Sequence, residues 1–135
     1  MSPQFFSEKM SHHLSSLVPG FEGHYYHIKR RNANTGDIAW FVYCRAEIEE
    51  GRVYLSKESR FVFMRDYIIE KFPAWQVEDV LSNLEFIIDR KIYLENEQKL
   101  RGLLPGITQK ISSLLVRHPD TAYQKIEEYL WIILK

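Results

Sequence analysis

The sequence has a single cysteine, no surplus of either charge and no long apolar run. Among its 135 residues only Cys44 carries a thiol, so no intramolecular disulfide can form, which suggests a reducing compartment. Lys and Arg number 18, as do Asp and Glu, so no overall charge attracts nucleic acid or a membrane surface. No run of about 18 apolar residues exists, and the N-terminus "MSPQFFSEKMSHH" lacks the pattern of a secretion signal. We therefore expect a cytoplasmic protein.

Motifs for catalysis and metal binding are also absent from the sequence. It contains no Gly-rich phosphate loop and no Gly-x-Ser-x-Gly motif. His12 and His13 diverge on a helix, and His24 and His27 point to opposite faces of a strand, so neither pair is a good chelate. Cys44 is expected on the core face of a strand, where a free cysteine usually acts as a small apolar residue. We expect no enzyme activity, no cofactor and no metal site.

Aromatic residues, in contrast, are abundant. The eight Tyr, eight Phe and three Trp are too many for a disordered chain. The apolar fraction of 45% and the charged fraction of 27% are typical of a globular protein. A chain of this length predicts one domain over residues 1–135.

Residues 24–58 predict three strands joined by two turns. A three-residue loop at 34–36, within the turn-forming "NANTGD", pairs Arg30 with Trp40, and a turn at 50–51 pairs Ile48 with Val53. Strand side chains alternate between faces, and both hairpins agree on which face is apolar. The face predicted to be buried holds Tyr26, Ile28, Ile38, Trp40, Val42, Cys44, Ala46, Ile48, Val53 and Leu55.

The opposite face predicts the partner-binding site, because it mixes aromatic rings with cations. Its binding residues are Tyr25, His27, Lys29, Arg31, Phe41, Tyr43, Arg45 and Tyr54. Tyr and Arg anchor protein interfaces, whereas rings between cations can also stack bases and hold phosphates. The nearby Glu47, Glu49 and Glu50 weaken the nucleic-acid interpretation. A third interpretation is that helices cover this face and make it a second core.

Helical periodicity predicts the other elements. Residues 5–17 form a helix that Pro19 and Gly20 end. Residues 59–72 are expected to be helical, although "RFVFMR" (60–65) also suits a fourth strand. The later helices are expected over residues 77–92, 96–106, 107–115 and 123–134. The fold class is therefore α+β: an N-terminal helix, a three-stranded antiparallel meander, then a run of about four to five helices.

The sequence favours a small non-catalytic protein-binding module, such as an inhibitor, immunity-type factor, adaptor or regulator. It would act through the aromatic and basic sheet face, or through the C-terminal helix "YLWIILK", which is apolar nearly all round and could also form a homodimer. The alternative is a nucleic-acid-binding regulator that uses the same sheet face. A third hypothesis is an enzyme with scattered site residues, such as His24, His27 and Tyr43. No membrane partner is expected.

Overall fold

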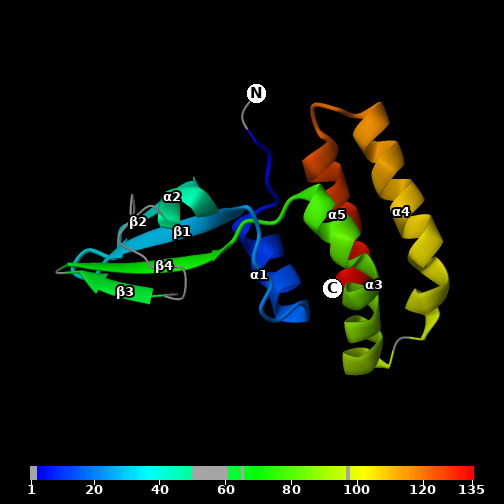
Figure 1. Ribbon diagram of the computed structural model, residues 1–135, viewed down its shortest axis with the longest axis horizontal. Helices are drawn as coiled ribbons and strands as arrows, with labels where there is room; N and C mark the ends of the chain where they lie inside the picture. Colours follow the sequence, from blue (N-terminus) through cyan, green and yellow to red (C-terminus); the bar gives the residue numbers. More distant parts are fainter. Residues whose placement is uncertain (1–2, 50–60, 65, 97) are drawn as a thin grey trace. The chain divides into compact units, whose positions relative to one another are not determined.

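The computed structural model describes residues 3–49, 61–64, 66–96 and 98–135 (Figure 1). Its elements are α1 (Glu8–Leu17), β1 (Tyr25–Asn32), β2 (Ile38–Cys44), α2 (Arg45–Glu49), β3 (Phe61–Met64), β4 (Tyr67–Pro73), α3 (Val77–Glu95), α4 (Lys99–Arg117) and α5 (Ala122–Leu134). The predicted α+β class is confirmed, with a helix first, an antiparallel sheet next and helices last.

The chain forms two compact units, which are described separately. A helical unit consists of Met1–Gly20 with Trp75–Lys135, and a sheet unit consists of Phe21–Ala74. The sheet unit is thus inserted, in chain order, between the first helix and the later helices of the helical unit. The expectation of a single domain over residues 1–135 stays a prediction.

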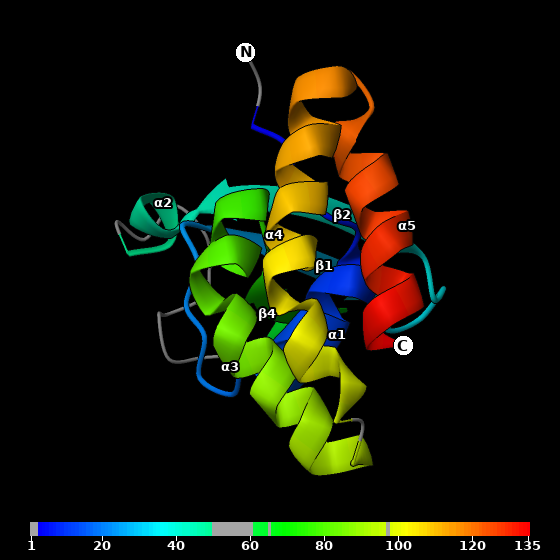
Figure 2. The same cartoon turned by 90° about the vertical axis from the view of Figure 1, so that its right-hand side faces the viewer.

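The helical unit is built from amphipathic helices whose apolar stripes face one another. Ser7 caps α1 by accepting a hydrogen bond at Oγ from the N–H of Met10 (3.1 Å). Figure 2 shows α3, α4 and α5 side by side, with α4 packed against both of the others. The fully or nearly fully buried apolar residues of the four helices are Met10, Leu14, Leu17, Val77, Val80, Leu84, Ile87, Ile88, Ile92, Leu100, Ile107, Ile111, Ala122, Ile126, Leu130 and Leu134.

Two polar contacts fix the ends of α3. The N–H of Gln76 donates to Asp79 Oδ2 (2.9 Å), which satisfies a backbone donor at the start of the helix. The buried Lys91 donates from Nζ to Glu95 Oε1 and to the carbonyl oxygen of Lys135, both at 2.6 Å. Lys91 therefore ties α3 to the end of α5.

The break predicted between residues 96–106 and 107–115 is wrong. One continuous helix, α4, runs from Lys99 to Arg117 with Pro105 inside it. Pro105 lies in the second turn, where it removes one intrahelical hydrogen bond and its ring crowds the carbonyl four residues before it. Ile107 and Ile111 are fully buried in the turns that follow. Tertiary packing has outweighed the local helix-breaking signal of "GLLPGI". The structure accordingly has three long helices after the sheet, fewer than the predicted four to five, in the part of the chain that it describes.

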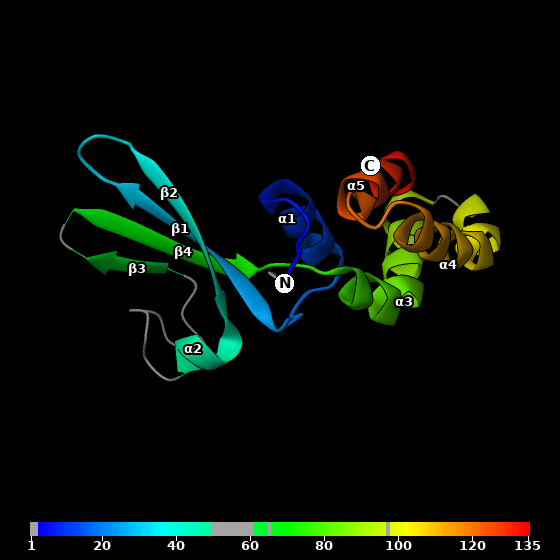
Figure 3. The same cartoon turned by 90° about the horizontal axis from the view of Figure 1, so that it is seen from above.

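The sheet unit contains four antiparallel strands in the order β2-β1-β4-β3 (Figure 3). The predicted helix over residues 59–72 is wrong, because residues 61–64 and 67–73 form the hairpin β3–β4. Short apolar runs fit the periodicity of a helix as well as that of a strand. For residues 67–73, hydrogen-bonded pairing with β1 selects the strand. The alternative of a strand within "RFVFMR" is thus correct for Phe61–Met64. The strand predicted around Val53 and Leu55 lies outside the described residues.

The predicted continuation of β2 to Ile48 is wrong. The strand ends at Cys44, and residues 45–49 turn into the short helix α2. Two contacts mark this end: the N–H of Arg45 donates to the carbonyl of His24 (2.8 Å), and the N–H of Cys44 donates to Glu47 Oε2 (3.3 Å). The Glu47 side chain thus satisfies the N–H of Cys44 at the end of the strand, because the turn into α2 brings it back to that position.

The β1–β2 hairpin is one residue out of the predicted register. The N–H of Asn32 donates to the carbonyl of Asp37 (2.8 Å), so the loop between them has four residues and not three. The side chain of Asn32 accepts from the N–H groups of Asn34 (2.9 Å) and Thr35 (3.1 Å), which stabilises this longer loop. Gly36 completes it with a φ of +79°, a conformation that favours glycine.

This shift exchanges the two faces of β2 relative to β1. Lys29 pairs with Trp40, Ile28 with Phe41 and Tyr26 with Tyr43. Paired residues share a face, so Trp40 lies on the side of Lys29 and not on the side of Ile28. The prediction that Trp40 is a core residue is wrong, since 42% of its surface is exposed.

The other residues of the predicted apolar face are likewise divided between buried and exposed positions. Tyr26 and Ile28 are buried as predicted. Ile38 and Val42 were also predicted to be buried, and both are exposed. Cys44, expected opposite Tyr26, is half-buried opposite Tyr25, and Ala46 is exposed in α2.

Candidate functional site

The seven described residues among the eight predicted to bind a partner do not form one surface. His27, Lys29 and Arg31 lie on the face of β1 that Trp40 shares, together with Tyr25, and Phe41 and Tyr43 lie on the other. Arg45 is in α2, where its guanidinium lies 3.8 Å from a carboxylate oxygen of Glu22, and Tyr54 is outside the described residues.

The first of these faces, here called the Trp40 face, carries a cluster of rings. The rings of Trp40 and Phe72 meet edge-to-face with centroids 5.8 Å apart, and His27 lies 5.3 Å from Phe72 and 6.4 Å from Trp40. Lys29 Nζ lies 5.7 Å from the centroid of Trp40. Whereas His27 and Phe72 are buried, Trp40 is exposed, so it is the accessible member of the cluster.

The opposite face, here called the Phe41 face, has a small core at one end and a stacked arginine at the other. Tyr26 and Ile28 are the buried residues of this core. Further along, the guanidinium carbon of Arg30 lies 5.3 Å from the ring of Phe41 and 4.9 Å from that of Tyr67. Arg30 was not among the predicted residues. The Asx-type turn at Asn32 is the sequence signal that would have placed Phe41 on the same face as Arg30.

Successive residues of β2 direct their backbone N–H and C=O groups to alternate sides of the strand. The bonds from Asn32 to Asp37 and from Arg45 to His24 fix the hydrogen-bonded pairs at the two ends of the ladder. Hydrogen-bonded and non-hydrogen-bonded pairs alternate in an antiparallel ladder. It follows that the N–H and C=O groups of Ile38, Trp40 and Val42 point away from β1.

No described strand pairs with that outer side of β2, which is an edge of the sheet. Natural edge strands are usually protected by Lys, Pro or a bulge. In contrast, the seven residues "IAWFVYC" of β2 contain neither a charged side chain nor proline. Ile38, Trp40, Phe41 and Val42 are all exposed, so apolar side chains from both faces flank an open backbone edge. This edge is the candidate site.

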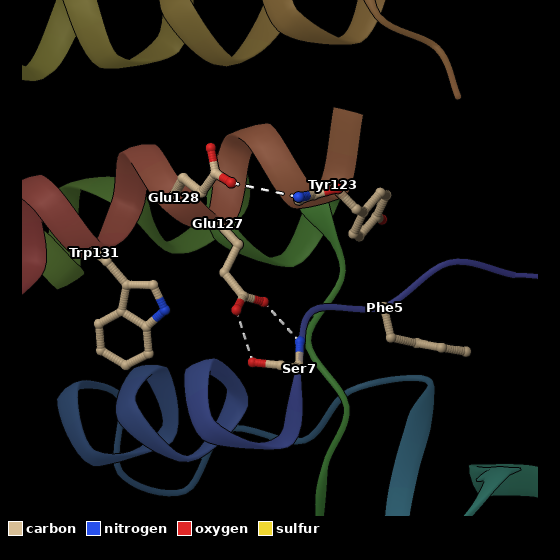
Figure 4. Close-up of a pocket in the computed structure, with 7 residues that line it drawn as sticks. Phe5, Ser7, Tyr123, Glu127, Glu128 and Trp131 are labelled. Atoms are coloured by element: carbon tan, nitrogen blue, oxygen red, sulfur yellow. Dashed lines mark hydrogen bonds between the residues drawn. The ribbon is translucent and has the colours of Figure 1, made fainter. Parts of the chain in front are cut away.

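The helical unit has a pocket of about 480 Å³ between the start of α1 and α5 (Figure 4). Glu127 points from α5 toward α1, where its carboxylate oxygens accept hydrogen bonds from the N–H and Oγ–H of Ser7 at 2.7 and 2.8 Å. Other lining residues are Phe5, Tyr123, Gln124, Glu128 and Trp131. Rings beside carboxylates suit a cationic group, but both Glu127 oxygens are already engaged. The hydrogen-bonded residues that line the pocket therefore join the start of α1 to α5.

Other contacts around this pocket have the same structural role. Trp131 lies between two residues of α1, with Lys9 Nζ 5.7 Å and the His13 ring 5.1 Å from its ring. Tyr123 accepts at its phenol oxygen from the N–H of Val77 (3.0 Å). These pairs are more than 45 residues apart in sequence, and no local pattern predicts them.

Burial raises the pKa of the Tyr123 phenol above its ordinary value of 10.0. The N–H of Val77 opposes this rise, and the carboxylates of Glu78 and Asp79 add to it. Burial likewise raises the pKa of Tyr129. Both phenols thus stay neutral near pH 7, which suits packing and hydrogen bonding better than proton transfer.

The C-terminal helix offers less apolar surface than its sequence suggested. In α5 the residues Ala122, Ile126, Leu130 and Leu134 are buried within the helical unit. Ile132 is exposed, and Trp131 and Ile133 are half-buried. Apolar residues that are exposed singly are common on protein surfaces. A homodimer through this helix stays a prediction.

No group of three or more His, Cys, Asp and Glu residues within the described ranges could hold a metal ion. Among the described helices, none is long and apolar enough to cross a membrane. Comparison of the chain with protein-family models, with curated proteins and with solved structures finds no match.

Proposed function

We propose that the chain is a non-catalytic protein-binding module whose partner adds an extended strand to β2. The observation that carries this proposal is the seven-residue, uncharged edge strand with its outward-facing backbone groups at Ile38, Trp40 and Val42. Strand addition gains affinity from backbone hydrogen bonds and specificity from the side chains that alternate beside them.

The Trp40 face supplies the side-chain contacts for such a partner. Trp is enriched among residues that dominate binding energy, and Trp40 is flanked on its strand by exposed Ile38 and Val42. Lys29 and Arg31 lie on the same face, on the neighbouring strand. The partner segment is therefore expected to carry apolar residues toward this face.

The nucleic-acid alternative has weaker support from the geometry. A binding platform needs aromatic rings and cations along one surface. Here the three consecutive cations of β1 divide between the faces, with Lys29 and Arg31 on one and Arg30 on the other. Arg30 is moreover stacked against Phe41 and Tyr67. A module that binds protein by its edge needs no continuous basic platform.

The substitution Val42→Pro tests the proposal. Because the N–H of Val42 points away from β1, Val42→Pro removes an outward donor and leaves the β1–β2 ladder intact. The probe is the tightest peptide selected from a random displayed library on the wild-type chain, measured by fluorescence anisotropy. We expect Val42→Pro to weaken its binding by about tenfold or more, equivalent to roughly one lost hydrogen bond and local crowding.

Val42→Thr is the matched control, since it keeps the N–H and nearly the same shape. It should bind the peptide within about threefold of wild type, a difference below 1 kcal/mol. Equal binding by wild type and Val42→Pro, with both variants folded by circular dichroism, would contradict strand addition at β2. Tight, salt-sensitive binding of a single-stranded oligonucleotide by the wild type would instead favour the nucleic-acid alternative.

A further inference from the structure

We infer that a second copy of this chain is a partner for β2, through antiparallel pairing of the two β2 strands about a two-fold axis at Trp40. The inference rests on the proposed strand addition and names its occupant. The relevant residues are Ile38, Trp40 and Val42, which are evenly spaced along one side of the strand. A two-fold axis makes such a contact self-complementary, as closed dimers require.

The backbone groups match this register. Centring the pair on Trp40 places each Ile38 opposite Val42 of the second copy and the two Trp40 residues opposite each other. All three are hydrogen-bonded positions, because their N–H and C=O groups point outward. The next outward N–H belongs to Cys44 and is already bonded to Glu47 (3.3 Å). The ladder therefore ends at Val42, the last outward donor without a bond to another described residue.

The side chains are compatible with the same register. On the Trp40 face, two Trp40 rings lie at the axis, with an Ile38–Val42 pair on each side. On the other face, Ala39 lies opposite Phe41 of the second copy, a small residue against a large one, at the closely spaced non-hydrogen-bonded positions. Both combinations belong to the apolar and aromatic cross-strand pairs that stabilise sheets.

Charge does not oppose the pairing. Ile38–Cys44 contains no charged residue, so no like charges meet across the new contact. Among the described residues, the nearest cations that face each other are the two Lys29 side chains, each on the strand behind its Trp40. They are three strand spacings apart, about 14 Å, which exceeds the Debye length of about 8 Å at physiological salt.

Hydrogen exchange of the purified full chain tests whether the dimer exists. A single strand pair buries less than the roughly 1,600 Å² of a standard interface, so the dimer should dissociate on dilution. At high concentration the amides of Ile38, Trp40 and Val42 should be protected, and dilution should abolish that protection. The amides of Ala39 and Phe41, which face β1, should stay protected at every concentration.

Cysteine cross-linking tests the register, in a Cys44→Ser background that removes the natural thiol. Ala39 and Phe41 of the two copies are directly opposite, within reach of a disulfide, whereas Ala39–Ala39 and Phe41–Phe41 are diagonal pairs about 7–8 Å apart. Mixing Ala39→Cys chains with Phe41→Cys chains should therefore give a mixed disulfide under mild oxidation. Each variant alone should cross-link at least tenfold more slowly.

Either of two outcomes would overturn the inference. Outward amides that exchange freely at every concentration, with no mixed disulfide, would show that β2 does not pair with a second copy. Peptide binding that is sensitive to Val42→Pro would in that case still support the proposed function. Cross-linking of Phe41→Cys alone would place the axis at Phe41 and refute the register.

Discussion

At the scale of single residues, two of the three tryptophans of this chain have contrasting environments. Trp75 is fully buried, and its indole N–H donates to Ser15 Oγ at 2.9 Å. Its backbone N–H and C=O are also bonded, to Ser11 Oγ and to the N–H of Phe6. Trp40 is exposed on an edge strand and contacts Phe72 by its ring edge. The two residues should therefore contribute differently to stability.

Truncating these two residues measures that difference. Trp75→Ala should lower the free energy of unfolding by about 3–5 kcal/mol, as expected for a large buried aromatic residue. Trp40→Ala should cost about 1 kcal/mol, the order of an aromatic pair contact. Urea denaturation of both variants provides the measurement. A loss of 3 kcal/mol or more for Trp40→Ala would mean that the Trp40 face is buried in solution.

At the scale of secondary-structure elements, α4 and the β1–β2 turn contain glycines with opposite requirements. Gly106 lies inside the helix, is exposed, and has no atom within 4 Å of the place a Cβ would occupy. Gly36 has equally open surroundings, but its φ of +79° disfavours any residue with a side chain. Space is equal at the two sites, so only backbone conformation distinguishes them.

Alanine substitutions separate these effects. Gly106→Ala should raise the free energy of unfolding by about 0.5–1 kcal/mol, because alanine loses less backbone entropy in a helix. Gly36→Ala should lower it by about 1–2 kcal/mol, the cost of a left-handed backbone for an L-residue. Thermal and urea unfolding of the two variants should therefore shift in opposite directions. A destabilised Gly106→Ala would indicate that α4 is not continuous at Pro105.

At the scale of the whole molecule, the sheet unit interrupts a helical unit that has its own core. The buried residues of α1 and of α3 to α5 all belong to this helical unit, which consists of the two segments Met1–Gly20 and Trp75–Lys135. The hydrogen bond from the Ala74 N–H to the Tyr25 carbonyl (2.9 Å) joins the first and last strands near the entry and exit of the sheet unit. This arrangement resembles an inserted domain, which a host often tolerates losing.

Replacing residues 21–74 by a flexible linker of about eight Gly and Ser residues tests this arrangement. The shortened chain should keep its helical circular dichroism and unfold in one cooperative transition. As a control, the same deletion combined with Trp75→Ala should abolish that transition, since Trp75 is part of the helical core. A non-cooperative shortened chain, even without Trp75→Ala, would show that the two units depend on each other.

The sequence alone determined the elements whose periodicity extends over several turns or over two strands. Met10, Leu14 and Leu17 repeat at helical spacing and form the buried stripe of α1, as do Val80, Leu84 and Ile87 in α3. Tyr26 and Ile28, two residues apart, mark the buried side of β1. In each case, burying the apolar side is possible in only one type of element, so the α+β class followed directly.

Only the tertiary structure decided the register of β2 and the composition of each face of the sheet. Asn32 bonds to two loop N–H groups and adds one residue to the turn, and a one-residue shift reverses every side chain of a strand. Pairing with β1 likewise made a strand of Tyr67–Pro73, although its apolar residues also fit a helix. Local pattern does not determine which strand becomes an edge, because that depends on contacts between distant segments. The exposed edge of β2 is the result of those contacts.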